Sequence, residues 1–314
     1  MGAKNGEKDK RRSIAWIIAV VWMSVITPLS LIKPDSLFAL LVWPAWILLL
    51  PGLLPLLLKR QPKWILGGVW AVCMAVAAEE PATFARSLTQ PEVGALRIVS
   101  LNCAGGSLEA AREVIPLKPD IVLLQESPSR PDLEKLRKEL FGREGSLVWG
   151  PDASILAKGH LEPMNLPKTA SNHVVADWSS PAGKELRITS LRLQPPVLRL
   201  DLSNPEAWKS FAENRRARRK ELDEIMDVQS GNPSDIIGGD FNTPPEKGYV
   251  AGLADSFAEQ GRGYGATCVN PLPCIVRIDQ VWRSSKLRTV NSFVVKTSHS
   301  DHRMIVSDFA WSGQ

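Results

Sequence analysis

The stretch Asp235-Ile-Ile-Gly-Gly-Asp240-Phe-Asn242-Thr joins a short apolar run to a polar turn. The apolar part, residues 235–238, has the length and composition of a buried strand. The turn after it carries Asp240 and Asn242, whose oxygen atoms can bind a cation or orient water. A single strand-end carboxylate is usually a turn former, so its meaning depends on whether other strands end in the same way.

Several other segments place polar side chains at or beside apolar strands. They are Asn102 after residues 96–101, Glu126 after 119–124, Asp279 within 277–283, and Asp301 and His302 before 304–311. Strand ends at one edge of a sheet converge, and pockets form there. Carboxylate and amide oxygens with one imidazole would make a site for a hard cation such as Mg²⁺.

The soluble part of the chain alternates strands with helices. Helices are expected over 107–117, 131–141 and 205–229, and further strands over 154–157, 174–178, 186–193 and 292–297. Alternation of this kind predicts a layered α/β fold.

Five motifs resemble, in order, those of the endonuclease/exonuclease/phosphatase superfamily. They are Leu-Asn-Cys-Ala-Gly-Gly (101–106), Gln-Glu (125–126), Gly-Gly-Asp-Phe-Asn-Thr (238–243), Arg-Ile-Asp-Gln-Val-Trp (277–282) and Ser-Asp-His (300–302). The resemblance covers residues 95–312 and implies a four-layer α/β sandwich with two mixed β-sheets. Apolar segments followed directly by such a domain also look like a membrane-anchored bacterial branch of the superfamily.

The resemblance implies a divalent-metal site for Mg²⁺ or Mn²⁺. Glu126 would be the principal metal ligand, Asn102 would help to position the metal or the phosphate, and Asp301 would face the metal from the other side. The metal would polarise the phosphoryl group and neutralise its charge.

The resemblance also assigns catalytic roles. Asp240 would orient or activate the attacking water, and Asn242 would donate to a phosphate oxygen as charge develops. His302 would act on the nucleophile or the phosphate. Asp279 would fix the tautomer of His302 and raise its basicity.

One position departs from the family pattern. A His, or in some branches a Tyr, is expected near the end of the strand that runs into Gln194-Pro195-Pro196, and this chain has Arg192 there. Arginine stays protonated and cannot shuttle protons, but its paired donors can clamp a phosphate. Arg192 is therefore a candidate phosphate-binding residue. The alternatives are a weakened domain, or His160 or His173 taking the place of the missing side chain.

The N-terminal region is apolar. A basic tail, residues 1–13, precedes three uncharged runs at 14–32, 37–58 and 64–78, and residues 79–94 are expected to be a linker. The first two runs reach the length that a bilayer core needs, and the third is short. Basic residues precede the first run and separate the second from the third, so the positive-inside rule places the C-terminal domain outside the cytoplasm. A two-span anchor would place it inside, and a cleaved signal peptide fits three runs poorly.

The charge of the chain is divided unevenly. Residues 1–78 hold nine of the 38 Lys and Arg but three of the 33 acidic residues, so the remainder is nearly neutral. Binders of duplex nucleic acid are usually basic, so nucleic acid is a possible but not a favoured partner. The run Arg215–Lys220 is either a solvated helix face or a patch for anionic headgroups. Cys268 and Cys274 form either a disulfide or two free thiols.

Together these patterns predict a multi-pass membrane protein, of bacterial inner-membrane type, with membrane lipids around its helices. Its extracytoplasmic domain is expected to be a divalent-metal-dependent phosphohydrolase or phosphodiesterase that acts on phosphate esters, with lipid-linked esters as candidates. The alternatives are an extracytoplasmic nuclease and a catalytically weakened binding protein on the same fold.

Overall fold

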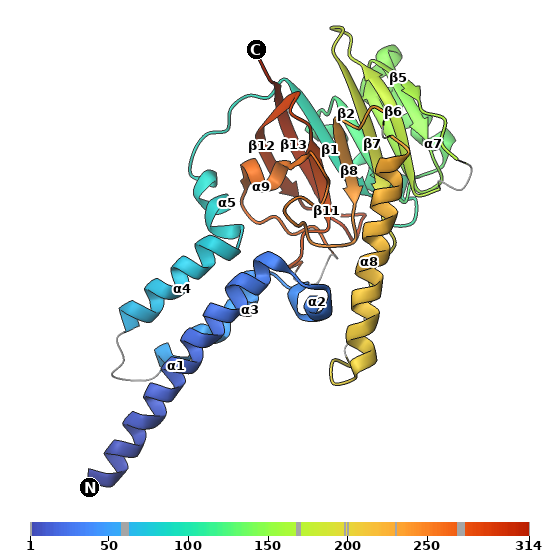
Figure 1. Ribbon diagram of the computed structural model, residues 1–314. Coiled ribbons are helices and arrows are strands. Elements are labelled where there is room, and N and C mark those ends of the chain that lie inside the picture. Colours follow the sequence, from blue (N-terminus) through green and yellow to red (C-terminus); the bar gives the residue numbers. More distant parts are fainter. Residues whose placement is uncertain are drawn as a thin grey trace. The chain divides into compact units, whose positions relative to one another are not determined.

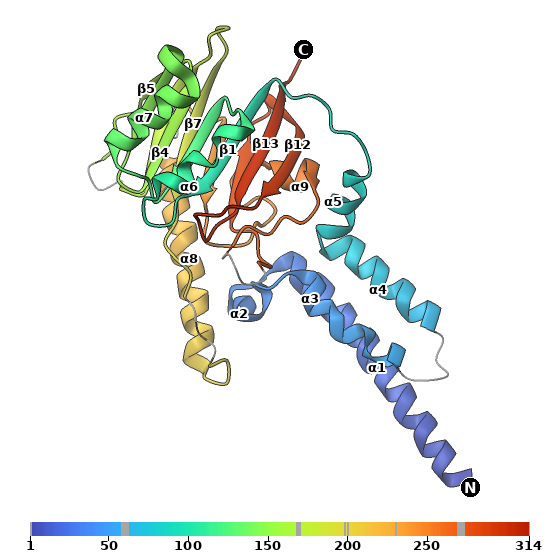
Figure 2. The ribbon, with the colours of Figure 1, turned by 180° about the vertical axis from the view of Figure 1, so that it is seen from behind.

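The computed structural model describes residues 2–57, 63–167, 171–197, 199, 201–229, 231–268 and 274–313, with side chains from Ile14 onward. The chain divides into two compact units. One comprises Met1–Ala82 and Arg199–Glu213, and the other comprises Thr83–Leu198 and Asn214–Gln314. Figures 1 and 2 show the N-terminal helices, the two sheets of the second unit and the helices that cover these sheets.

Helices make up the described N-terminal part of the first unit. They are α1 (Gly2–Ile32), η1 (Asp35–Leu37), α2 (Phe38–Leu41), α3 (Ala45–Leu49), η2 (Leu50–Leu57) and α4 (Lys63–Ala77). Met23, Leu49 and Leu66 lie in one buried apolar cluster. The Trp22 indole donates to the Leu48 carbonyl at 2.8 Å, which gives this buried-facing ring a polar partner.

One stretch in these helices, Ile14–Ile32 of α1, is long and apolar enough to cross a membrane as a single helix. The second expected span is broken by a bend of 84° between Asp35–Leu41 and Ala45–Leu56. The third, α4, is fifteen residues long and reaches the needed length only if the helix after it is counted as well. Leu58 and the basic residues Lys59 and Arg60 lie outside the described residues.

The expected linker contains a helix, α5 (Glu80–Ser87). From Thr83 onward this segment is bound to the second unit. The Gly263 amide donates to the Thr83 carbonyl at 3.2 Å, and the Arg86 guanidinium donates to the carbonyls of Ala258 and Gly261, both at 3.3 Å. The second half of the segment is therefore part of the domain rather than a loose tether.

The second unit contains two mixed β-sheets. The first has the order β10-β12-β13-β1-β2-β4-β3. Its strands are β1 (Leu96–Asn102), β2 (Ile121–Gln125), β3 (Gly145–Trp149), β4 (Ala153–Lys158), β10 (Gly261–Arg262), β12 (Leu287–Val295) and β13 (Met304–Trp311). The second has the order β5-β6-β7-β8-β11-β9. Its strands are β5 (His160–Pro163), β6 (His173–Ser179), β7 (Glu185–Arg192), β8 (Ile236–Asp240), β9 (Ala254–Asp255) and β11 (Asp279–Arg283).

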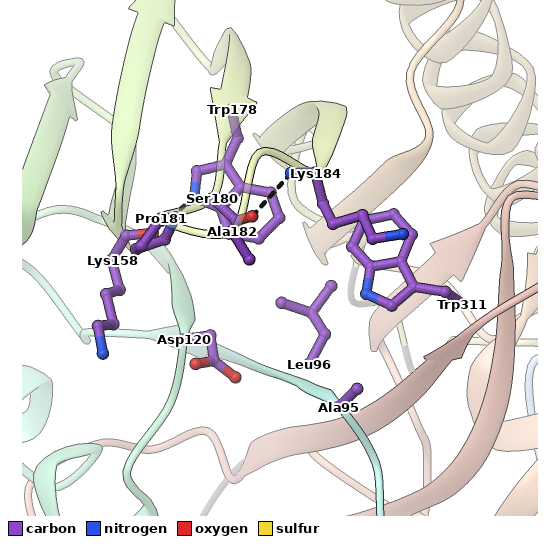
Figure 3. Close-up of a pocket in the computed structure, with 10 residues that line it drawn as sticks. All are labelled: Ala95, Leu96, Asp120, Lys158, Trp178, Ser180, Pro181, Ala182, Lys184 and Trp311. Carbon is purple, nitrogen blue, oxygen red and sulfur yellow. Dashed lines mark hydrogen bonds between the residues drawn. The ribbon is translucent and has the colours of Figure 1, made fainter. Parts of the chain in front are cut away.

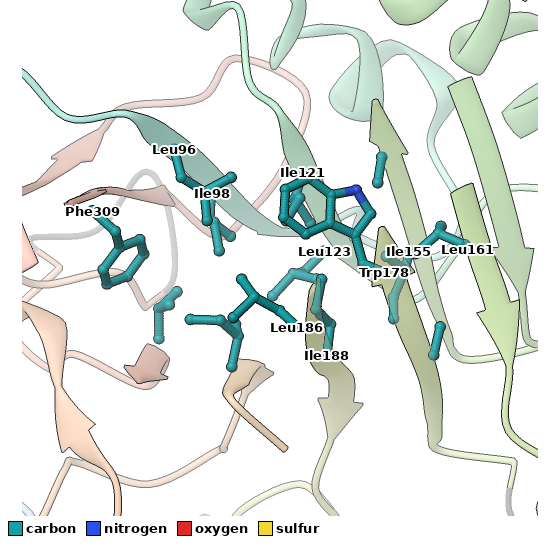
Figure 4. Close-up of a cluster of buried hydrophobic side chains, with 14 of the residues drawn as sticks. Leu96, Ile98, Ile121, Leu123, Ile155, Leu161, Trp178, Leu186, Ile188 and Phe309 are labelled. Carbon is teal, nitrogen blue, oxygen red and sulfur yellow. The ribbon is translucent and has the colours of Figure 1, made fainter. Parts of the chain in front are cut away.

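The two sheets pack face to face around an apolar core (Figure 4). Side chains alternate along a strand, so Leu96 and Ile98 of β1 point into this core, whereas Val99 and Leu101 point to the opposite face of the first sheet. That other face is covered by α6 (Leu108–Arg112) and α7 (Arg130–Phe141).

The outer face of the second sheet is covered by α8 (Pro205–Asp227), whose Leu222 and Ile225 pack on Leu191 and Ile237. The layers are thus helices, sheet, sheet and helix. The expected four-layer α/β sandwich with two mixed sheets is confirmed.

The run Arg215–Lys220 is not an open basic patch. Arg215 and Arg218 are buried, and the Arg215 guanidinium pairs with Glu246 at 2.7 Å. Arg219 reaches the same carboxylate, also at 2.7 Å. Arg215 and Arg219 therefore join α8 to the loop after β8, which is a structural role.

Candidate active site

The expected site residues meet at one edge of the sandwich because of strand register. In the first sheet, β1 runs parallel to β2 and pairs Asn102 with Gln125, so Glu126 is the next residue at that edge. In the second sheet, Asp240 pairs with Arg192 on parallel β7 and with Asp279 on antiparallel β11. The ends of β1, β2, β7 and β8 thus lie together with the start of β11.

Asn102 links the two sheets. Its side-chain amide Nδ2 donates to Glu126 Oε1 and to Asp240 Oδ2, each at 3.1 Å. Its Oδ1 accepts from the Ala104 amide at 2.9 Å, which fixes the orientation of the group. Asn102 therefore holds two carboxylates from different sheets at a set spacing.

Glu126 is a half-buried, ionised carboxylate. It accepts the Gly105 amide at 2.6 Å through Oε2 and pairs with Arg192 Nη2 at 2.8 Å through Oε1. Burial acts to raise the pKa of Glu126, but the hydrogen bonds from Asn102 and Gly105 and the charge of Arg192 outweigh it and hold the pKa below its usual range. Glu126 is thus charged at neutral pH.

Asp279 and His302 form a buried pair. His302 Nδ1 lies 2.9 Å from Asp279 Oδ2, and His302 Nε2 lies 4.0 Å from Asp240 Oδ2. Burial acts to lower the pKa of His302, but the neighbouring carboxylates, Asp279 first, raise it to about 10. The loop that carries His302 is fixed by Ser300, whose hydroxyl donates to the Asn102 carbonyl at 2.7 Å.

Asp240 is almost fully buried beside a second carboxylate. Burial raises the pKa of Asp240 to about 7, and the charge of Asp279 acts in the same direction. Asp240, Asp279 and His302 each offer a ligand atom, and these three atoms lie within 4.8 Å of one another. Two buried acids beside one imidazole create an excess of negative charge that a cation would relieve.

Asn242 and Asp301 occupy different positions around this pair. The Asn242 side-chain amide donates to the Leu193 carbonyl at 2.8 Å, and since an amide group has two N–H donors, one is left for another acceptor. Asp301 is exposed in the loop before β13, and its charge is one of those that raise the pKa of His302. It lies near the imidazole but outside the buried acid–His group.

Arg192 lies at the site, where it binds two carboxylates. Besides Glu126 it pairs with Asp152, with Nη1 3.2 Å from Oδ2. The sequence did not single out Asp152. It precedes β4, which runs antiparallel to β2, so it lies at the same edge of the sheet. Only the strand pairing, which the sequence leaves open, could have identified it. His160 is an exposed residue of β5. His173 pairs with Leu191, which packs under α8, so its side chain lies on the opposite face of the sheet from Arg192, and neither histidine takes the place of Arg192.

The backbone is strained at two candidate residues. Glu126 has φ 45° and Asn242 has φ 52°, both in the left-handed region that non-glycine residues rarely adopt. Gly239 meets a different demand: a Cβ there would lie 1.8 Å from the Leu191 carbonyl oxygen. The strand can approach β7 this closely, and so place Asp240, only with glycine at this position.

The residues present fit a divalent cation. Their oxygen-rich donor set is the kind that Mg²⁺ and Mn²⁺ prefer, and Asp279 Oδ1 is a buried oxygen with no hydrogen-bond partner in the described part of the chain. Carboxylates outnumber cations here: Glu126, Asp152, Asp240, Asp279 and Asp301 against Arg192 and His302.

A cavity of about 370 Å³ lies elsewhere in the domain (Figure 3). It is lined by Leu96 and Asp120, which are at the opposite ends of β1 and β2 from the candidate site, and by Trp178 and Trp311. Lys184 lies over the Trp311 ring, 5.3 Å from its centroid. None of the candidate catalytic residues lines this cavity.

Comparison with known proteins agrees with this geometry. Residues 99–302 match the model of the Endonuclease/Exonuclease/phosphatase family. No curated protein matches the chain significantly. Among solved structures, a family protein from Bacteroides vulgatus has a TM-score of 0.53 at 14% identity, covering 69% of this chain and 99% of its own.

A family protein from Bacteroides thetaiotaomicron has a TM-score of 0.52 at 13% identity, with 70% and 98% covered. A mannosyl-6-phosphatase from the same organism has a TM-score of 0.51 at 13% identity, with 68% and 99% covered. At these identities the solved structures support the fold alone.

Proposed function

Because the chain belongs to the Endonuclease/Exonuclease/phosphatase family, a family of phosphate-ester hydrolases, we propose that the site around Asp240 is its active site. The observation that carries the proposal is the junction of the two sheets. There Asn102 joins Glu126 to Asp240, and Asp279 binds His302.

In this proposal Glu126, with Asn102 and Asp301, would hold a divalent cation, Mg²⁺ or Mn²⁺, which would supply Lewis-acid charge to neutralise the phosphoryl oxygens. Glu126 suits this role because its carboxylate is ionised and partly exposed, whereas Asp240 and Asp279 are deeply buried.

Asp240 orients and deprotonates the attacking water. Its pKa of about 7 allows it to take up a proton near neutral pH, which a carboxylate of ordinary pKa does poorly. His302 is protonated at neutral pH, so it acts as a cationic donor to the developing charge on the phosphate. Asp279 keeps it charged and oriented. Asn242 offers its remaining N–H to a phosphate oxygen, and Arg192 binds a second one.

The experiment is a panel of phosphomonoesters, phosphodiesters, lipid-linked phosphates and DNA, incubated with the full chain in detergent and Mg²⁺ or Mn²⁺. Hydrolysis of one class that is lost in Asp240→Asn would support the site. Hydrolysis that survives this substitution would refute it. A folded protein that binds metal and hydrolyses none of the panel would favour the binding-protein alternative.

We further propose that the N-terminal helices anchor the domain in a membrane and that the domain lies outside the cytoplasm. The apolar stretch Ile14–Ile32 and the basic residues that flank the apolar runs support this. A tethered domain would reach lipid-linked phosphate esters directly. Resistance of the protein to carbonate extraction is expected, with digestion of the domain by protease added to right-side-out cells whose outer membrane has been opened. A domain that the protease leaves intact would refute the external placement.

A further inference from the structure

Arg192 forms an ion pair with Glu126, the carboxylate that is proposed to bind the metal. Glu126 Oε1 accepts from both Asn102 Nδ2 and Arg192 Nη2, and Oε2 accepts from the Gly105 amide. Both oxygens therefore already have donors. The amide donors are fixed by the backbone and by the link between the sheets, so Arg192 is the partner that can move.

Arg192 also contacts Asp152, which could hold the guanidinium after it leaves Glu126. Its Nη1 lies 3.2 Å from Asp152 Oδ2, so one guanidinium bridges two carboxylates. The side chains of Arg192, Glu126 and Asp152 each retain between a quarter and a third of their exposure, which leaves room for movement. An arginine cannot be neutralised by losing its proton, so it must leave Glu126 as a cation.

The charges of these three groups favour an exchange. Two carboxylates and one guanidinium carry a net charge of −1, which attracts a cation. Once a divalent cation is bound, the same group carries +1, which attracts a phosphate. A guanidinium held only by Asp152 then has donors to offer to that phosphate.

We propose that Arg192 is an internal placeholder for the metal and that Asp152 is a positioning residue that draws it off Glu126. Arg192 competes with the divalent cation for Glu126, and Asp152 sets how strongly it competes. This inference rests on the proposed function, in which Glu126 holds the metal and Arg192 binds phosphate.

The test is calorimetric titration of the full chain in detergent with Mn²⁺, without substrate. Arg192→Gln removes the competing cation, so Mn²⁺ should bind about two- to fivefold more tightly, the range expected for losing one partly exposed ion pair. Asp152→Asn leaves Arg192 with Glu126 alone, so Mn²⁺ should bind about threefold more weakly. In the Arg192→Gln background, Asp152→Asn should have no effect, which separates positioning from a general structural role.

Asp177→Asn is the matched control, since Asp177 also pairs with an arginine, Arg187, at 2.7 Å but away from the site. It should leave Mn²⁺ affinity unchanged. If Arg192→Gln fails to fold, Arg192→Lys replaces it: a lysine makes a single contact, so the effect of Asp152→Asn should disappear.

Glu126→Gln distinguishes the two levels of the proposal. Mn²⁺ binding that survives Glu126→Gln overturns the metal site itself, and the placeholder with it. Binding that is lost in Glu126→Gln but unchanged or weakened in Arg192→Gln keeps the metal site and overturns the placeholder alone.

Discussion

The buried pair of Asp279 and His302 gives a prediction whose size can be worked out. Asp279 is fully buried, and its Oδ2 lies 2.9 Å from His302 Nδ1. Asp279→Asn retains the shape of the side chain and removes its charge. The substitution therefore tests whether the carboxylate, rather than packing, keeps His302 protonated.

The pKa of His302 is about 10, against an ordinary value of 6.5. At about 1.4 kcal/mol for each pKa unit, its surroundings favour the imidazolium by about 5 kcal/mol. Asp279 is the largest favourable cause, and burial opposes it. Asp279→Asn should therefore lower the pKa of His302 by at least about two units, to about 8 or below.

The measurement is an NMR titration of the imidazole protons of the full chain in detergent. The chain has four histidines, so His302→Gln suffices to assign the resonance. Asp301→Asn is the control. This neighbouring carboxylate is exposed, so its removal should lower the pKa of His302 much less than Asp279→Asn does. A pKa of His302 that is the same in Asp279→Asn and in the wild type would refute the reasoning.

The same pair makes stability depend on pH. Because the pKa of His302 is raised in the folded state, its contribution to stability is complete below pH 6.5 and is lost as the pH rises through about 10. The melting temperature of the wild type should therefore fall across this window. In Asp279→Asn the fall should be much smaller. An equally steep fall in both proteins would show that other groups cause it.

Three further predictions concern the scaffold. Gly239→Ala would place a Cβ 1.8 Å from a backbone carbonyl oxygen, so we expect a loss above about 4 kcal/mol, seen as a protein that does not fold. Arg215→Ala should cost about 3 kcal/mol in denaturant unfolding because it breaks a buried ion pair, whereas Lys220→Ala on the same helix should cost under about 0.5 kcal/mol; equal losses would contradict the burial of Arg215. Cys268 and Cys274 have sulfur atoms 3.5 Å apart, and the hydrogen bond from Cys274 lowers the pKa of Cys268 to about 6. Oxidised glutathione at neutral pH should therefore yield an intramolecular disulfide, detected by mass spectrometry as the loss of two hydrogen atoms; a stable mixed disulfide alone would contradict this.

The sequence predicted the layers of the domain well because apolar runs report burial directly. The strand before Asp240 was expected from Ile236 and Ile237, and both are fully buried. The long helix expected over residues 205–229 is α8, which ends at Asp227. The positions of the apolar residues along the chain were enough to predict these two elements, because those residues are buried in the core of the domain.

Elements without a strong apolar pattern were not found. The edge strand β3 has four partly buried residues and an exposed one, Trp149, and β5 contains one buried residue, Leu161. Their backbones are ordered by pairing with β4 and β6, which is information that a local pattern does not carry. The helix expected over residues 107–117 ends early because the 3₁₀ turn at Ile115–Leu117 contains a proline.

The site could be predicted only as a set of residues. Strand ends indicated Asn102, Glu126 and Asp240, but not that Asn102 would bind the other two. Asp152 had no signal, since its position depends on β4 running antiparallel to β2. Arg192 was expected to bind phosphate, and nothing in its neighbours along the chain indicated that two carboxylates would bind it first.

The energetic cost of the site bears on whether the domain is an active enzyme or a catalytically weakened binding protein. Glu126 and Asn242 hold left-handed backbone, which costs of order 1 kcal/mol or more for each residue. Asp240 and Asp279 are buried carboxylates side by side, and this raises the pKa of Asp240 to about 7. Single substitutions, such as a glycine at 126 or an asparagine at 240, would relieve these costs without disturbing the apolar core. A site that must gather charge around a metal and a phosphate requires both features. The strain therefore favours a working charged site over a domain that has lost its site, and hydrolysis that is lost in Asp240→Asn separates catalysis from binding alone.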